Sequence, residues 1–417
     1  MKRRFVQLLV IVAMTSALST LKAAATDLRV TYSPANFGEM YQAVASAFAK
    51  RYPDIHIRLE GSPGYGDLSQ RTLRSAIAGD LPDVSHEGLS YIRRYAVRSL
   101  AVALDDFIAK DPDWSSLGLG DSVRGVGGVK GVTYAIPFAV STMNLFFNLQ
   151  LVKAAGGDPN NLPSDWDGVL ELAKKIDALS DGVSGIYFDY EAGDAIAFQT
   201  LVFSRGGSMM NADESKITFE GSEGQWAMNL IRRFGEAGQV DMSRQQARQM
   251  FVAGKLGIYQ NTSSNLGAFA QQIGNTFPYA MTPFPTTESG RTPAAGNGML
   301  MFSQTREKRD AAWKYIKFAA GQEAQAIMAK MTGYVPVNHG VVENPDMRSF
   351  YNSNPNYAVP LAQIDKMAAW YAFPGENGDK IAKTITDEMR EVITLRKPAA
   401  AGLSSAAANA RRLLKLQ

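Results

Sequence analysis

The sequence has 417 residues, of which 46% are hydrophobic, and it contains no cysteine. Four of its 43 basic residues (Lys2, Arg3, Arg4 and Lys22) and none of its 40 acidic residues lie in the first 25 positions. The rest of the chain is therefore close to neutral. Because neutralising many phosphates requires a clustered excess of Lys and Arg, this balance excludes nucleic acid as an expected partner.

Residues 1–25 have the pattern of a cleavable signal peptide. Basic residues at positions 2–4 precede an apolar stretch from Phe5 to about Leu18, and three alanines end at Ala25. Roughly 14 apolar residues are too few to span a bilayer, which takes about 20. We therefore predict cleavage near Ala25 and a periplasmic location. The lack of cysteine also removes a site for a lipid anchor.

The next segments alternate between strand and helix patterns. A strand is predicted at 27–32, a helix at 39–51 with Met40, Val44, Phe48 and Ala49 on one face, a strand at 55–59, and a helix at 68–78 after a Gly/Pro loop. This order predicts an α/β fold with a largely parallel sheet. The remaining length, about 390 residues, is enough for two domains without disulfides.

Longer helical patterns follow in the second half. They cover 165–179 with Ser164 as N-cap, then 222–237, 244–253, 308–320, 323–331, 380–396 and a C-terminal segment to Leu414. Apolar runs at 134–138 and 279–283 suggest that the chain leaves one lobe and later returns to it. We expect residues 26–137 plus 279–330 in one lobe and 138–278 plus 331–417 in the other.

Five segments stand in order along the chain: VASAFAKRYPDIHI, AIAGDLPDV, GVTYAIPFAVSTMNLFFNLQLVKAAG, FVAGKLGIY and TGYVPVN. Together they resemble the family 1 extracellular solute-binding proteins. The resemblance implies a periplasmic-binding-protein-like fold, in which two α/β lobes joined by a hinge close around a small hydrophilic solute. It also implies delivery of that solute to the membrane permease of an ABC importer.

Within that family, the sequence is most similar to proteins that bind glycerol 3-phosphate or its diesters. The matching positions are Tyr65, Glu87, Ser141, Ser264, Gly296-Asn297 and Tyr334. Two features of those proteins are absent, namely a tryptophan near residues 187–194 and a late phosphate-binding arginine. A neutral sugar or polyol is therefore an expected ligand alongside a phosphate compound, and a phosphate would need backbone N–H groups near Gly296.

A sugar site needs carboxylates and amides for hydroxyl groups and aromatic rings for C–H faces. On this basis, the predicted ligand-binding residues are Tyr65, Glu87, Ser141, Asp194, Ser264, Asn297, Tyr334, Trp370 and Tyr371. Each also has a structural interpretation. Glu87 fits a solvated acid at a helix N-terminus, Ser264 a helix cap, Trp370 packing between lobes, and Asp194 a surface acid.

Enzyme signatures are absent from the sequence. It contains no Gly-x-Ser-x-Gly, and its three histidines (His56, His86 and His339) are widely separated. We expect no catalytic residue, metal or cofactor, and a monomeric protein. Two alternatives remain open at this point: a secreted carbohydrate-active enzyme with two carboxylates about 5–9.5 Å apart, and a receptor that reports ligand to a partner.

Overall fold

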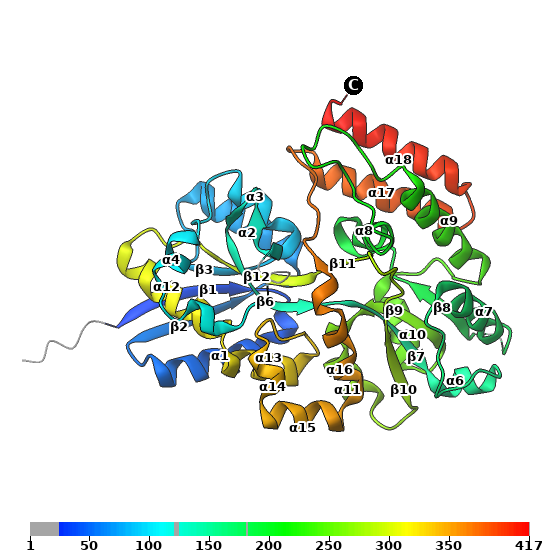
Figure 1. Ribbon diagram of the computed structural model, residues 1–417, viewed down its shortest axis with the longest axis horizontal. Coiled ribbons are helices and arrows are strands. Elements are labelled where there is room, and N and C mark those ends of the chain that lie inside the picture. Colours follow the sequence, from blue (N-terminus) through cyan, green and yellow to red (C-terminus); the bar gives the residue numbers. More distant parts are fainter. Residues whose placement is uncertain (1–24, 121–124, 181, 417) are drawn as a thin grey trace, which may run out of the picture.

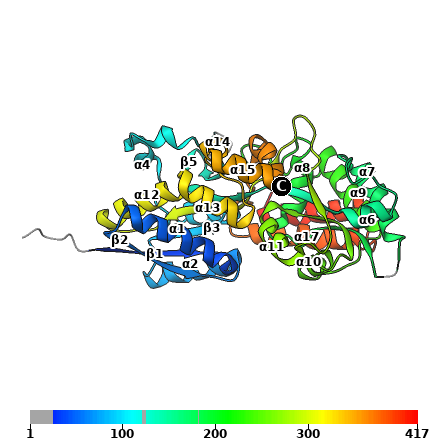
Figure 2. The ribbon, with the colours of Figure 1, turned by 90° about the horizontal axis from the view of Figure 1, so that it is seen from below.

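The computed structural model describes residues 25–120, 125–180 and 182–416. In this part of the chain two lobes lie side by side, each around its own β-sheet, as two directions of view show (Figure 1, Figure 2). The expected signal peptide lies outside the described residues except for Ala25. Among the described helices, none combines the length and apolar character that crossing a bilayer requires.

The first lobe contains a five-stranded sheet in the order β2-β1-β3-β12-β6. Its strands are β1 (Thr26–Tyr32), β2 (Ile55–Gly61), β3 (Val84–Gly88), β6 (Ala135–Ser141) and β12 (Ala295–Met301). The strand β1 runs parallel to β2 and β3, whereas β12 is antiparallel to both β3 and β6. Every residue of β3, β6 and β12 is buried, as expected for strands covered on both faces.

Helices cover both faces of this sheet. They are α1 (Gly38–Arg51), α2 (Tyr65–Ala78), α3 (Ile92–Ala96), α4 (Asp105–Lys110), α12 (Arg306–Ala319) and α13 (Gln322–Thr332). Figure 1 shows α2 and α3 on one side of the sheet and α1 and α13 on the other. The predicted apolar face of α1 is confirmed for Met40, Val44 and Phe48, which are buried in the core of this lobe. It is wrong for Ala49, which is exposed, because nine residues along a helix turn Ala49 to the side opposite Met40.

The second lobe contains a four-stranded sheet in the order β10-β7-β9-β8. Its strands are β7 (Met143–Asn148), β8 (Ser184–Phe188), β9 (Leu256–Thr262) and β10 (Tyr279–Pro283). Only β8 and β9 are parallel in this sheet. The expectation of a largely parallel sheet is therefore wrong beyond the first βαβ units, because strands that enter from the other lobe add in antiparallel fashion.

Within the described part of the chain, helices surround this second sheet. They are α6 (Leu149–Ala154), α7 (Trp166–Asp177), α8 (Ile196–Phe203), α9 (Ser222–Glu236), α10 (Arg244–Val252), α11 (Leu266–Ile273), α17 (Gly378–Ile393) and α18 (Ala399–Leu414). Helices α9, α17 and α18 pack together at one end of the lobe (Figure 1). The N-cap of α7 is Asp165 rather than Ser164, because the Asp165 carboxylate accepts a 2.8 Å hydrogen bond from the Gly168 N–H.

The chain passes between the sheets at Thr142, between β10 and β12, and after α13. The last passage contains α14 (Gly340–Glu343), α15 (Pro345–Ser353), α16 (Pro355–Ala358) and β13 (Met367–Ala368). Strand β13 pairs with β11 (Thr292–Pro293). A separate small hairpin of β4 (Gly128–Val129) and β5 (Val132–Thr133) lies in the first lobe. The expected boundary at residue 279 is wrong for its first strand, because β10 pairs with β7 of the second sheet. The expected boundary at 137/138 falls inside β6, which stays in the first sheet to Ser141, and Tyr334, expected in the second lobe, packs in the core of the first.

Candidate functional site

The two sheets present the same kind of edge to each other. Strand β6 ends at Ser141, and the antiparallel β12 begins beside it at Ala295. In the second lobe β8 ends at Phe188 and β9 at Thr262. Open α/β sheets hold ligands beyond the carboxyl ends of their strands, and here two such edges enclose a cavity of about 550 Å³. That volume suits a small organic molecule.

The wall from the first lobe carries two phenols. Tyr65 is the first residue of α2, and its hydroxyl oxygen lies 3.4 Å from that of Tyr334. Ser141 and the backbone of Gly296 continue this wall. Burial raises the pKa of both the Tyr65 and the Tyr334 phenol, so each stays protonated and can donate a hydrogen bond at neutral pH.

A buried hydrogen-bond chain supports this wall from behind. The side-chain amide of Asn297 donates to the phenol oxygens of Tyr65 and Tyr41, at 3.1 and 3.2 Å. Its carbonyl oxygen lies 3.4 Å from Nδ1 of His86, and Nε2 of His86 lies 3.0 Å from the Tyr315 hydroxyl. Because the amide oxygen can only accept, Nδ1 carries the proton and Nε2 accepts from Tyr315.

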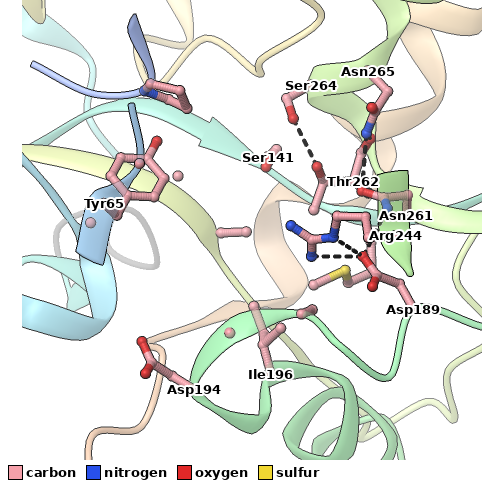
Figure 3. A pocket seen from close by; sticks show the side chains of 18 of the residues that line it. Tyr65, Ser141, Asp189, Asp194, Ile196, Arg244, Asn261, Thr262, Ser264 and Asn265 are labelled. Atoms are coloured by element: carbon pink, nitrogen blue, oxygen red, sulfur yellow. Dashed lines mark hydrogen bonds and ion pairs between the residues drawn. The ribbon is translucent and has the colours of Figure 1, made fainter. Parts of the chain in front are cut away.

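The wall from the second lobe is more highly charged. Asp189 follows β8, and its Oδ2 atom accepts hydrogen bonds from Arg244 Nε at 2.7 Å and from Asn261 Nδ2 at 2.8 Å. Asn261 Oδ1 accepts from the Asn265 amide at 3.0 Å. Figure 3 shows Arg244 and Asp189 facing each other, across the cavity from Tyr65. These contacts fix several polar groups before any solute enters.

Asp194 joins the two walls. It precedes α8, and both Asp194 and Ala195 have left-handed backbone angles (φ of 56° and 54°), which non-glycine residues seldom adopt. The Ser90 hydroxyl of the first lobe donates a 2.6 Å hydrogen bond to its Oδ2 atom. Burial raises the pKa of Asp194, and this hydrogen bond partly offsets that rise.

Two ion pairs tie the lobes together outside the cavity. Arg93 forms a two-pronged pair with Glu214, which also accepts a 3.1 Å hydrogen bond from the Tyr371 hydroxyl. Nη2 of Arg94 lies 2.7 and 2.8 Å from the two carboxylate oxygens of Asp379. Both arginines belong to α3 of the first lobe, so these pairs hold the lobes in the present arrangement.

Comparisons with known proteins agree with this architecture. The family described as bacterial extracellular solute-binding protein matches residues 43–359. The chain belongs to this family. Its members are binding proteins, so the chain is a solute-binding protein and not an enzyme, and the alternative of a carbohydrate-active enzyme is not favoured.

Two relatives illustrate the family. The solute-binding protein is 26% identical over 325 residues to the maltotriose-binding protein of Pyrococcus abyssi, covering 75% of this chain and 66% of the relative. It is 22% identical over 273 residues to the sn-glycerol-3-phosphate-binding periplasmic protein of Rhizobium meliloti, covering 63% of this chain and 62% of the relative.

Solved structures show the same fold. UgpB from Mycobacterium tuberculosis, in complex with glycerophosphocholine, superposes with a TM-score of 0.82 at 20% identity, covering 93% of this chain and 98% of that one. The GacH receptor of Streptomyces glaucescens, studied with acarbose, gives 0.77 at 18% identity, covering 94% and 99%. The predicted periplasmic-binding-protein-like fold is therefore confirmed.

Six of the nine predicted residues line the cavity of this solute-binding protein. They are Tyr65, Ser141, Asp194, Ser264, Tyr334 and Trp370. The first and the last of them in the chain, Tyr65 and Trp370, are 305 positions apart, and the fold brings both to the same cavity. Their contact with a solute stays a prediction.

The other three predicted residues do not line it. Glu87 is completely buried in β3, where its carboxylate accepts hydrogen bonds from Thr72 and Ser85 at 2.7 and 2.8 Å, and burial raises its pKa. Neither direct binding nor a solvated helix-terminal position fits Glu87. Asn297 lies behind Tyr65, and Tyr371 pairs with Glu214 outside the cavity.

Sequence reasoning missed much of the charged wall. Asp189, Arg244, Arg248 and Asn261 all line the cavity. Arg244 and Arg248 stand four residues apart in a predicted helix, so the sequence did indicate a shared basic face. Nothing local indicated that this face meets Asp189, 55 positions away.

Within the described ranges, no group of three or more His, Asp or Glu side chains is placed to hold a metal ion.

Proposed function

We propose that this protein is the substrate-binding component of an ABC importer and that it captures a small hydroxylated solute of the carbohydrate class. The observation that carries the proposal is the cavity of about 550 Å³ whose polar lining comes from both lobes. The groups that line it include phenols, hydroxyls, amides and two carboxylates (Asp189 and Asp194), which match the donors and acceptors of a polyhydroxylated molecule.

The lining also suggests how the solute would lie. Ser141 and the two phenols of Tyr65 and Tyr334 face it from the first lobe, while Asn261 and Ser264 face it from the second. Trp370 offers an aromatic face for C–H groups. Because a solute in this position contacts both lobes only when they are together, its binding would favour the closed arrangement.

The names of the relatives support the same class of ligand. They include binders of maltotriose and of glycerol 3-phosphate, and two of the similar structures are described as ABC transporter binding proteins. We accordingly propose a periplasmic monomer that delivers its solute to the permease, with no role for nucleic acid. The signal peptide and its cleavage near Ala25 belong to this proposal.

A thermal-shift screen over mono- and disaccharides, polyols and glycerophosphate compounds tests the proposal. A solute that binds only the folded protein adds about 2.7 kcal/mol of stability at 100 times its Kd, which is easily seen as a higher Tm. Hits are then incubated with the protein and analysed by mass spectrometry. We expect saturable binding and recovery of the unchanged solute. No hit in any class, or turnover of a hit, would contradict the proposal.

A further inference from the structure

Two arginines project from one face of α10 into the cavity. Arg244 is the first residue of this nine-residue helix, and Arg248 follows one turn later. Like charges four residues apart on a helix repel each other, so the arrangement opposes helix formation. A negative charge beside the two arginines would offset this repulsion.

Arg244 has such a charge within the protein. Its Nε and Nη2 atoms both lie 2.7 Å from Oδ2 of Asp189. Asp189 is almost fully buried, whereas about half of the Arg244 side chain is exposed (49%) and therefore faces the open cavity. The pair is close to neutral, and it leaves Arg244 donors free to point at a solute.

Arg248 has no such charge. Within residues 25–120, 125–180 and 182–416, no carboxylate forms an ion pair or hydrogen bond with it, and its one contact of note is the Phe269 ring at 6.0 Å. The other acids nearby are engaged elsewhere. Asp194 accepts from Ser90, and Glu191 accepts a 3.1 Å hydrogen bond from the backbone N–H of Arg244.

We propose that Arg248, with Arg244 beside it, binds an anionic group of the captured solute, so that the protein selects acidic hydroxylated molecules over neutral ones. The inference rests on the proposed function and narrows its ligand class. A guanidinium offers a fixed fork of donors that matches a carboxylate or a phosphate, and hydrogen bonds to such groups are the stronger ones. Carboxylate and phosphate share this chemistry.

The test uses calorimetry on matched solutes that differ only in the group at one terminal carbon, which is neutral in the parent and anionic in the other two. One set is glucose, glucuronate and glucose 6-phosphate, and the other is glycerol, glycerate and glycerol 3-phosphate. We expect an acidic member to bind at least ~10-fold more tightly than its neutral parent, the gain typical of a charged hydrogen bond. The carboxylate and phosphate arms then distinguish a sugar acid from a sugar phosphate.

Variants assign the effect to the arginine. Arg248→Gln should remove the preference for the acidic member and leave the neutral parent within about twofold, while Arg248→Lys should keep part of it. Arg306→Gln is the matched control, since Arg306 is an exposed arginine on α12 of the other lobe (side chain 96% exposed). Circular dichroism melting verifies that each variant folds.

The outcomes separate the two claims. If no solute of either set, and none of the wider screen, binds the wild-type protein, the proposed function itself fails. If neutral solutes bind as tightly as acidic ones, the proposed function survives and the anion preference is overturned. If Arg248→Gln weakens neutral and acidic solutes equally, Arg248 has only a structural role and the inference is likewise overturned.

Discussion

The amide nitrogen of Asn297 donates a 3.1 Å hydrogen bond to the phenol oxygen of Tyr65. Asn297 is buried, and Tyr65 lines the cavity, so the amide acts from behind the wall. The same amide also bonds to Tyr41 and His86. The position of the Tyr65 ring is therefore set by the core of the first lobe rather than by the solute.

Asn297→Leu tests this positioning role. The substitution leaves the hydroxyls of Tyr65 and Tyr41 without their buried partner, and it should lower the free energy of unfolding by about 1–3 kcal/mol. Because Tyr65 is no longer held, solute affinity should fall by about 5- to 20-fold as well. Denaturant unfolding and calorimetry measure the two effects. The exposed Asn229→Leu serves as control, and unchanged affinity in Asn297→Leu would contradict the positioning role.

Glu87→Ala should affect stability more than binding. Its carboxylate accepts hydrogen bonds from Thr72 on α2 and from Ser85, all within the core. Removing it leaves the buried hydroxyl protons of Thr72 and Ser85 without their acceptor, which should reduce the free energy of unfolding by about 1–3 kcal/mol. Solute affinity should stay within about threefold of wild type. A larger loss of affinity without a change in the melting curve would show that Glu87 reaches the solute after all.

The buried His86 predicts a specific pH dependence of stability. Burial lowers its pKa from 6.5 to about 3 in the folded protein. As the pH falls below 6.5, the unfolded chain binds a proton on His86 that the folded protein does not bind until about pH 3. The free energy of unfolding therefore decreases with falling pH in this window, by up to about 1.4 kcal/mol per pH unit for one proton.

In His86→Gln, the free energy of unfolding should fall less steeply between roughly pH 6 and 4, with a slope smaller by about 1.4 kcal/mol per pH unit, the contribution of one proton. Denaturant unfolding at several pH values measures it, and carboxylates that titrate in the same range cancel when the variant is compared with wild type. His56→Gln, which changes an exposed histidine, is the control. Identical slopes for His86→Gln and wild type would show that His86 is not held neutral by the fold.

The ion pairs between the lobes predict graded effects on closure. Glu214 is mostly buried and accepts from both Arg93 and Tyr371, whereas the Asp379 side chain is 71% exposed. An exposed pair contributes about 1 kcal/mol or less, so Asp379→Asn should weaken solute binding by no more than about fivefold. Glu214→Gln should weaken it further and increase the radius of gyration without solute. Equal effects of the two variants in calorimetry and scattering would contradict this ranking.

The local pattern of the sequence predicted the elements well, and its family resemblance predicted the fold. The α1 face of Met40, Val44 and Phe48 is buried as its spacing requires. The assignment of β10 to the first lobe was wrong because an apolar run shows that a strand is buried and not which sheet it joins. Strand pairing is decided by contacts between residues that are more than a hundred positions apart in the sequence, as between β10 and β7.

The candidate site was predicted in part for a similar reason. Tyr65 begins α2, Ser141 ends β6 and Tyr334 follows α13, all at ends of elements where the resemblance pointed to them. Glu87 and Asn297 lie one layer deeper, because every residue of β3 and β12 is buried and the alternation that would separate the two faces is missing. The pairing of Asp189 with Arg244 arises only when β8 and α10 come together in the folded lobe.

Calorimetric titration of two variants, one from each lobe, tests the central claim most directly. Tyr65→Ala changes a lining residue from the first lobe and Asn261→Ala one from the second, on opposite walls of the same cavity. For the solute found by screening, we predict one binding site per chain in the wild-type protein and a loss of affinity of about tenfold or more in each variant. Wild-type affinity in both variants would place the solute outside this cavity and contradict the account.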